Sequence, residues 1–200
     1  MKPKLIILEG ADGCGKTTQT NLIAQKLDAK IISQPSRDNL VGFIRDVAKK
    51  DLTLNAFERQ LLIAISHTVD SFTKFDGESN IVMDRSFISG VVYGKMTGVP
   101  TPKMMMINQI LSSIYLNAAS GKYDTKIFFI VRPERLDNPD KDVFESSIKW
   151  EDLNKEYEDL YNKSETFKTP FFSMNEKRFI IRSSGSIQDT LKEIWTYVEN

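Results

Sequence analysis

The chain has 200 residues, and its 27 basic and 27 acidic side chains leave no net charge. This balance disfavours a basic nucleic-acid-binding domain, so no nucleic acid partner is expected. The single cysteine, Cys14, and the single histidine, His67, exclude internal disulfides, cysteine-based metal sites and serine–histidine hydrolases. No apolar run approaches the roughly 20 residues that cross a bilayer, and no signal-peptide pattern opens the chain. We therefore expect a cytoplasmic protein with no membrane partner.

Short aliphatic runs predict five buried strands, at Lys4–Glu9, Lys30–Ser33, Asn80–Asp84, Lys126–Arg132 and Arg178–Arg182. Between them, apolar residues recur at helical spacing, from Phe57 to Phe72, Ile107 to Ala118, Phe144 to Tyr161 and Ile187 to Val198. Ser186 stands before the last stripe as a candidate N-cap. Strands that alternate with helices predict an α/β fold with a parallel sheet. No repeat or linker divides the chain, so residues 1–200 are expected to form a single domain.

A complete P-loop motif follows the first predicted strand. Gly10-Ala11-Asp12-Gly13-Cys14-Gly15-Lys16-Thr17 matches G-x-x-x-x-G-K-[ST], and a helical stretch, Thr18–Leu27, comes after it. In such a loop the backbone N–H groups surround a phosphate, the lysine reaches the β- and γ-phosphates, and the hydroxyl binds Mg²⁺. The sequence therefore predicts a nucleotide site.

The P-loop leaves the reaction open. A GTPase needs a guanine-reading N-K-x-D element, and Asn162-Lys163-Ser164-Glu165 lacks its aspartate. A compact P-loop chain of this size favours a small-molecule kinase, by analogy at the level of the fold.

Glu9–Gln19 resembles the opening of thymidylate kinases, which phosphorylate dTMP to dTDP with ATP. Three further stretches resemble segments of that family, namely Asp84–Tyr93, Ser33–Arg37 and Asp142–Glu145. The resemblance implies a five-stranded parallel sheet flanked by helices, ATP and Mg²⁺ as cofactors, dTMP as the acceptor, and a homodimer.

The donor nucleotide is expected on the P-loop, at Gly10, Asp12, Gly13, Cys14, Gly15, Lys16, Thr17 and Thr18. Thr17 and Asp84 are candidate ligands of Mg²⁺, because strand-end acids hold this ion in P-loop enzymes. The resemblance adds Glu145 to the metal site. Lys16 is expected to act in catalysis as a cation on the transferred phosphoryl group.

The acceptor needs cations of its own. Arg85 and Arg37 are the candidates, since a guanidinium can fork onto a phosphate. By resemblance, Asp12 binds the 3′-hydroxyl, Tyr93 lies under the deoxyribose and leaves no room for a 2′-hydroxyl, and Ser89 and Gly90 belong to the acceptor site. We expect Arg85 and Asp12 to take part in catalysis.

Three positions depart from the family pattern. Within the predicted helix Asn55–Phe75, Ile63 and His67 stand where the family has a thymine-stacking phenylalanine and a base-reading arginine. The third is Gly90, where some members place a polar thymine reader. We expect looser base selection, with His67 donating more strongly below its usual pKa near 6.5.

The catalytic arginine of the family also lacks its usual place. Position 13 of the P-loop is glycine, and Val143 occupies an expected arginine position in the short lid predicted at 132–142. Arg135, Lys141 and Lys149 are the nearby cations, and Arg135 is our candidate for catalysis.

Two alternatives stay open beside a thymidylate kinase. One is a kinase for another deoxynucleoside monophosphate or for a deoxynucleoside, which Ile63, His67 and Gly90 allow. The other is a non-catalytic P-loop nucleotide-binding protein. It is disfavoured by four intact residues, Lys16, Thr17, Asp84 and Arg85.

Overall fold

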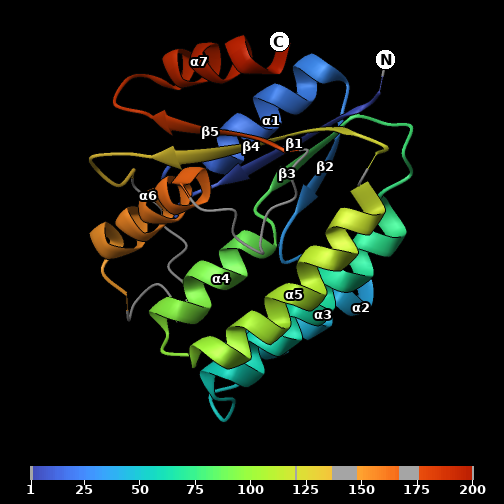
Figure 1. Ribbon diagram of the computed structural model, residues 1–200, viewed down its shortest axis with the longest axis vertical. Coiled ribbons are helices and arrows are strands. Elements are labelled where there is room, and N and C mark those ends of the chain that lie inside the picture. Colours follow the sequence, from blue (N-terminus) through green and yellow to red (C-terminus); the bar gives the residue numbers. More distant parts are fainter. Residues whose placement is uncertain (1, 120, 137–147, 167–175, 200) are drawn as a thin grey trace.

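The computed structural model describes residues 2–119, 121–136, 148–166 and 176–199. Its centre is a five-stranded sheet in the order β2-β3-β1-β4-β5, and every neighbouring pair of strands is parallel (Figure 1). The strands are β1 (Lys4–Glu9), β2 (Lys30–Ser33), β3 (Ile81–Asp84), β4 (Asp124–Val131) and β5 (Lys177–Arg182). The predicted fold class, a P-loop-type parallel sheet flanked by helices, is confirmed, and predicted strand ends differ by at most two residues.

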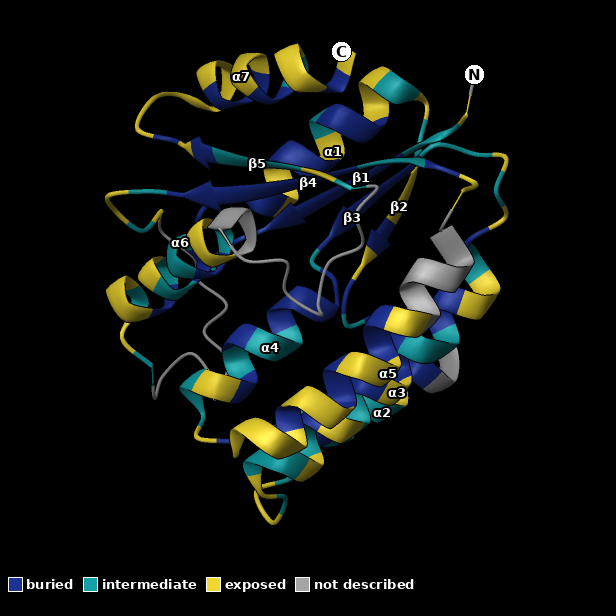
Figure 2. Cartoon of the chain, in the orientation of Figure 1, coloured by how far each residue is buried: buried dark blue, intermediate teal, exposed yellow. Residues whose placement is uncertain are grey.

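Helices cover both faces of the sheet, so that the central strands are buried on both sides (Figures 1 and 2). One face carries α1 (Lys16–Leu27) and α7 (Ile187–Glu199). The other carries α2 (Asn39–Lys50), α3 (Ala56–Lys74), α4 (Phe87–Met96), α5 (Thr101–Ala119) and α6 (Trp150–Thr166). The helices α2 and α4 lie in stretches for which the sequence predicted no helix.

Alternate residues of β1 belong to two hydrophobic cores, one on each face of the sheet, because successive side chains of a strand point to opposite faces. Ile6 and Leu8 pack with Ile23 of α1 and Ile194 of α7. Leu5 and Ile7 belong to the core beneath α3, α4, α5 and α6. The P-loop thus leaves the end of a strand that is fixed from both sides.

Side-chain caps are present at the starts of α3 and α7, and only the cap of α7 was predicted from the sequence. Asn55 accepts from Glu58 N while Glu58 accepts from Asn55 N, which forms a capping box at the start of α3. Ser186 caps α7 by accepting from Asp189 N at 3.2 Å. Both helices therefore begin where their side chains satisfy free backbone N–H groups.

The apolar stripe of α3 faces outward. Leu61, Ile65 and Phe72 are exposed, and Phe72 has 74% of its surface open. The buried side chains of the helix are mostly polar: Gln60, Ala64, Ser66, His67, Asp70 and Ser71. A helix with a polar buried face and an apolar exposed face is unusual. We expect its buried face to line a polar ligand site and its exposed face to contact another protein surface.

Among the described residues, no helix combines the length and the apolar character that a bilayer crossing requires.

Candidate active site

The P-loop connects β1 to α1 through three glycines in backbone conformations that side chains avoid. Gly10, Gly13 and Gly15 have φ angles of 149°, 80° and 95°. A Cβ at Gly13 would lie 2.8 Å from the Leu136 carbonyl oxygen and from Arg135 Cγ. Glycine is therefore required at position 13, where the chain after β4 lies directly on the loop.

Lys16, the first residue of α1, is buried, with 4% of its surface exposed. Its Nζ donates a 2.7 Å hydrogen bond to the Ala11 carbonyl and lies 4.0 Å from Asp12 Oδ1. The ammonium group is thus held across the loop, at the helix N-terminus that favours an anion.

Thr17 and Asp84 meet at the ends of α1 and β3. The Thr17 hydroxyl donates to Asp84 Oδ2 at 2.6 Å, while Asp84 Oδ1 is buried and has no hydrogen-bond partner among the described residues. A hydroxyl and a carboxylate oxygen are ligands that Mg²⁺ accepts, and this ion commonly uses one or two carboxylates together with substrate phosphates and water. These residues fit a magnesium site. The third predicted ligand, Glu145, lies outside the described residues, as do Lys141 and Val143.

Arg85 leaves the carboxyl end of β3 in a left-handed backbone conformation, with φ of 72°. Its side chain points back to the P-loop. Its guanidinium forms an ion pair with Asp12 and donates to the Ser89 hydroxyl at 3.0 Å and to the Tyr157 hydroxyl at 3.1 Å. A positive φ at a residue with a large side chain costs free energy, and such a conformation is typical of a functional position.

Tyr93 completes the group around Arg85. Its hydroxyl donates to Asp12 Oδ2 at 2.5 Å, and the Arg85 guanidinium lies 5.3 Å from the centre of its ring. Burial raises the pKa of Tyr93 well above its usual value, although the charge of Arg85 opposes this. The phenol is therefore protonated at neutral pH, so it donates to the carboxylate of Asp12.

Glu9, at the end of β1, was not predicted as a site residue, yet it is hydrogen-bonded to residues of this group. Its buried carboxylate accepts from Ser86 N at 2.6 Å, from the Ser86 hydroxyl at 2.7 Å and from the Ser89 hydroxyl at 2.7 Å. Burial raises the pKa of Glu9, against the effect of these hydrogen bonds and of the Arg85 charge. The sequence does carry a signal for Glu9. A carboxylate at the end of an otherwise aliphatic strand needs polar partners when it is buried.

Two aromatic residues of α6 also contact the site, and the sequence did not predict these contacts. Besides bonding to Arg85, the fully buried Tyr157 shares a 2.8 Å hydrogen bond with Ser89. Trp150 donates from its indole nitrogen to the Asp12 carbonyl at 2.6 Å. Their helical spacing predicts a core face and carries no sign of these polar contacts.

The described part of the predicted lid lies on the P-loop. Leu136 N donates to the Gly13 carbonyl at 2.9 Å. Arg135 borders a small cavity together with Asp12, Ile148, Trp150 and Leu153. Of the predicted lid cations, Arg135 is therefore beside the P-loop, whereas Lys149 is exposed.

The remaining residues predicted for the acceptor site differ in how far they are buried. Ile63 is half-buried on α3 and Gly90 is half-buried on α4, and Arg37 is exposed in the loop between β2 and α2. His67 is 2% exposed, and burial lowers its pKa to about 3. The expectation that His67 gains a proton near pH 6.5 is therefore wrong, because a buried imidazolium would lose its hydration.

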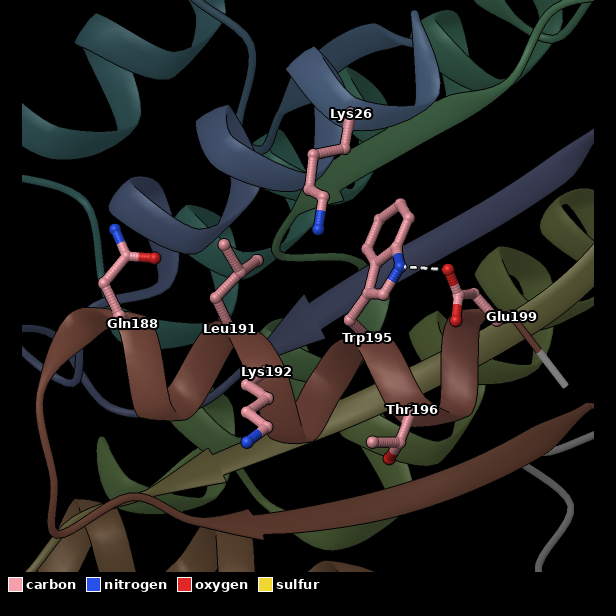
Figure 3. Close-up of a pocket in the computed structure, with 7 residues that line it drawn as sticks. All are labelled: Lys26, Gln188, Leu191, Lys192, Trp195, Thr196 and Glu199. Atoms are coloured by element: carbon pink, nitrogen blue, oxygen red, sulfur yellow. Dashed lines mark hydrogen bonds between the residues drawn. The ribbon is translucent and has the colours of Figure 1, made fainter.

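A separate shallow hollow of about 230 Å³ lies between α1 and α7, on the opposite face of the sheet from α3 and α4 (Figure 3). Lys26 lies 4.1 Å from the centre of the Trp195 ring there, and the Trp195 indole donates to Glu199 at 2.5 Å. None of the predicted site residues lines it.

Comparison with known proteins places this geometry in a family. The family model for thymidylate kinase matches residues 8–106, which include the P-loop, Asp84, Arg85 and Tyr93. A relative from Methanococcus maripaludis, named "Probable thymidylate kinase", is 28% identical over 96% of this chain and 92% of its own.

Solved structures share the fold. A thymidylate kinase from Ehrlichia chaffeensis superposes with a TM-score of 0.71 at 16% identity, over all of both chains. A deoxyadenosine kinase from M. mycoides, with bound dATP, reaches 0.68 at 19% identity over 98% of this chain and 100% of its own. With the family model, the relatives and the P-loop geometry in agreement, the chain belongs to the thymidylate kinase family.

Proposed function

We propose that the protein transfers the γ-phosphoryl group of ATP to dTMP, with Mg²⁺, and releases ADP and dTDP. The observation that carries this proposal is the position of Arg85. Its guanidinium lies 3.4 Å from the Gly10 carbonyl and pairs with Asp12, so a cation for a second phosphate stands against the P-loop. Two phosphate-binding groups that lie next to each other, the P-loop and Arg85, suit a phosphoryl transfer between two nucleotides.

On the donor side, the P-loop N–H groups and the N-terminus of α1 hold the β- and γ-phosphates. Lys16, released from the Ala11 carbonyl, places its charge on the phosphoryl group in transfer. Thr17 and Asp84 would hold Mg²⁺, which neutralises charge on the phosphates when it is bound.

On the acceptor side, Arg85 and Arg37 bind the 5′-phosphate of dTMP. Arg85 needs no large movement, because Ser89 and Tyr157 already fix one side of its guanidinium. Asp12 accepts from the 3′-hydroxyl, and the ring of Tyr93 occupies the space of a 2′-hydroxyl. Ser89 and Gly90 border the nucleoside on α4. These roles follow the residue match to the family and the contacts among Asp12, Arg85 and Tyr93.

Arg135 is our proposed replacement for the family's catalytic arginine. The close approach of its Cγ to Gly13 supports this role, since a guanidinium anchored there lies within reach of the transferred group. A cation beside the P-loop stabilises the charge that spreads over the phosphoryl oxygens in the transition state.

We further propose a homodimer in which two copies join through the outward face of α3. This face presents Leu61, Ile65 and Phe72, and the neighbouring exposed apolar residues are Phe43 on α2 and Met106 and Ile110 on α5. Exposed apolar side chains on adjacent helices are costly in water, and a second copy would bury them.

The test is a coupled assay of ADP release with ATP, Mg²⁺ and each of dTMP, dUMP, dGMP, dCMP, dAMP and thymidine. We expect the highest kcat/KM with dTMP. Lys16→Ala should lower turnover by orders of magnitude, whereas Lys26→Ala, at the far end of the same helix, should not. Highest efficiency with thymidine would favour a deoxynucleoside kinase, and no acceptor-dependent ADP would favour a non-catalytic nucleotide-binding protein.

A further inference from the structure

Gln60 on α3 is a buried polar side chain that faces the predicted acceptor site. It is 3% exposed. Its Oε1 is 3.8 Å from the place that a Cβ at Gly90 would occupy, and among the described residues no other atom outside the local helix comes within 4 Å of that place. The carboxamide of Gln60 therefore lies over the one residue of this part of α4 that has no side chain.

Within the described residues, the Gln60 carboxamide makes no hydrogen bond. Two other buried glutamines each donate one: Gln19 Nε2 donates to the Ile187 carbonyl at 2.9 Å, and Gln34 Nε2 donates to Asp70 at 2.7 Å, while the Oε1 atoms of both are buried without a partner among the described residues. Neither polar atom of the Gln60 carboxamide is among the fully buried atoms without a partner in the described part of the chain, so the amide keeps some access to solvent although the residue as a whole is buried. A polar group that is accessible and makes no hydrogen bond to the protein is available to a ligand.

The surroundings of Gln60 indicate which part of a ligand this is. Gly90 stands between Arg85 and Tyr93, which bind the phosphate and sugar in the proposed function. Ile63 lies one turn after Gln60 on α3. A nucleoside whose sugar contacts Tyr93 would direct its base along α4 toward Gly90 and Gln60.

We propose that Gln60 reads the base of the acceptor nucleotide. Its NH₂ group donates to O4 of thymine while its Oε1 accepts from N3–H, which satisfies the carboxamide on both sides. This inference rests on the proposed function, because it takes a nucleoside monophosphate as the acceptor.

The other candidates on these helices are less suited to the task. His67 is buried, neutral at physiological pH and has an interaction partner of its own. Ile63 offers only apolar contact, and Gly90 offers no side chain. Gln60 takes over the polar contact that a side chain at position 90 would otherwise make.

Two substitutions at Gln60 separate base reading from a structural role. Gln60→Leu removes both hydrogen bonds and keeps the volume, so kcat/KM for dTMP should fall about tenfold to hundredfold, mainly through KM. The KM for ATP should not change. Gln60→Glu presents only acceptors, which suit the N4 amino group of cytosine and repel O4 of thymine. The ratio of kcat/KM for dTMP over dCMP should fall at least about tenfold.

Gly90→Asn in the Gln60→Leu background is the matched rescue. The space at Gly90 is bounded only by the side chain at position 60, and its φ is not positive, so the new side chain fits. The double variant should regain part of its efficiency with dTMP. Gln25→Leu, on an exposed position of α1, is the control for loss of an amide.

The outcomes distinguish this inference from the proposed function. A wild-type protein that phosphorylates no nucleoside monophosphate overturns the function, and with it the role of Gln60. If wild type is active but both Gln60 variants keep its KM and its base preference within twofold, the function stands and the inference is overturned. If Gln60→Leu unfolds, Gln60→Met and Gln60→Glu give the same comparison of base preference.

Discussion

The hydroxyl of Thr17 donates a 2.6 Å hydrogen bond to Asp84 Oδ2, which joins the start of α1 to the end of β3. In the part of the chain that the structure describes, the second carboxylate oxygen is buried without a partner. The two side chains are 67 positions apart in the chain. Their contact brings together the two residue types that the P-loop needs to hold Mg²⁺.

Asp84→Asn should therefore weaken the metal site, because a carboxamide oxygen carries no full negative charge. We expect turnover to fall on the order of a hundredfold and half-maximal activity to need more Mg²⁺. The measurement is activity against Mg²⁺ concentration at saturating ATP and dTMP. Asp189→Asn, which changes only the cap of α7, should match wild type. An unchanged magnesium curve in Asp84→Asn would remove this residue from the metal site.

Arg85→Ala should raise the KM for the acceptor and lower kcat while it spares ATP binding. The reason is that in the proposed function this guanidinium binds the acceptor phosphate, with Asp12, Ser89 and Tyr157 holding it in place. Arg85→Lys should recover little, since an ammonium group cannot fork onto a phosphate. Steady-state kinetics in both substrates checks this, with Arg182→Ala as the control, because Arg182 is in an exposed ion pair with Glu158. Weaker ATP binding in Arg85→Ala would reverse the placement of the two substrates.

Tyr93→Ala should relax discrimination against ribose. In the proposed function its ring occupies the space of a 2′-hydroxyl, so removal should improve the ribonucleotide relative to dTMP by about tenfold. Tyr93→Phe keeps the ring but loses the 2.5 Å hydrogen bond to Asp12, so it should keep discrimination and lower kcat. The measurement is the ratio of kcat/KM for dTMP and its ribonucleotide counterpart. If the alanine variant keeps the wild-type ratio, the ring has only a structural role.

His67 should make the protein less stable in mild acid. Burial lowers the folded-state pKa of His67 to about 3, whereas the unfolded chain takes up a proton below about 6.5. The stabilisation is thus complete above pH 6.5 and is lost as pH falls toward 3. Between pH 7.5 and 5.0, His67 should remove about 2 kcal/mol from the free energy of unfolding.

Urea unfolding of wild type and His67→Gln at both pH values measures this difference. The variant should lose about 2 kcal/mol less than wild type over that interval, and wild-type base preference should be flat across it. Equal losses in the two proteins would contradict a neutral, buried His67.

Phe72→Glu should dissociate the proposed homodimer, because it places a charge on the outward apolar face of α3. Phe72 has 74% of its surface exposed, so the substitution should not disturb the fold of one copy. Light scattering after size-exclusion chromatography gives the mass. Ile187→Glu, an exposed apolar position on α7, is the matched control and should leave the mass unchanged. A monomeric wild type would overturn the homodimer, as would a Phe72→Glu protein of wild-type mass.

Features built from neighbouring residues could be predicted from the sequence. The run from Gly10 to Thr17 is contiguous, and its glycines, lysine and threonine have one geometry between a strand and a helix. The aliphatic runs predicted all five strands within two residues. The central strands β1, β3 and β4 are buried along most of their length, and a strand buried on both faces needs apolar side chains. The expectation of burial was wrong for the edge strand β2, which is mostly exposed. The predicted cap at Ser186 was equally local.

Only the tertiary structure decided which face of each helix turned inward and which distant residues met. The spacing of Leu61, Ile65 and Phe72 predicts a stripe on one side of α3, yet the same spacing suits a core and an outward face. Glu9, Ser89 and Tyr157 come from three separate elements, and nothing in their local sequence shows their contact. The depth of His67, and therefore its pKa, likewise depends on all the elements around it. Periodicity reports a pattern along one element, whereas contacts and burial are set by the packing of all elements together.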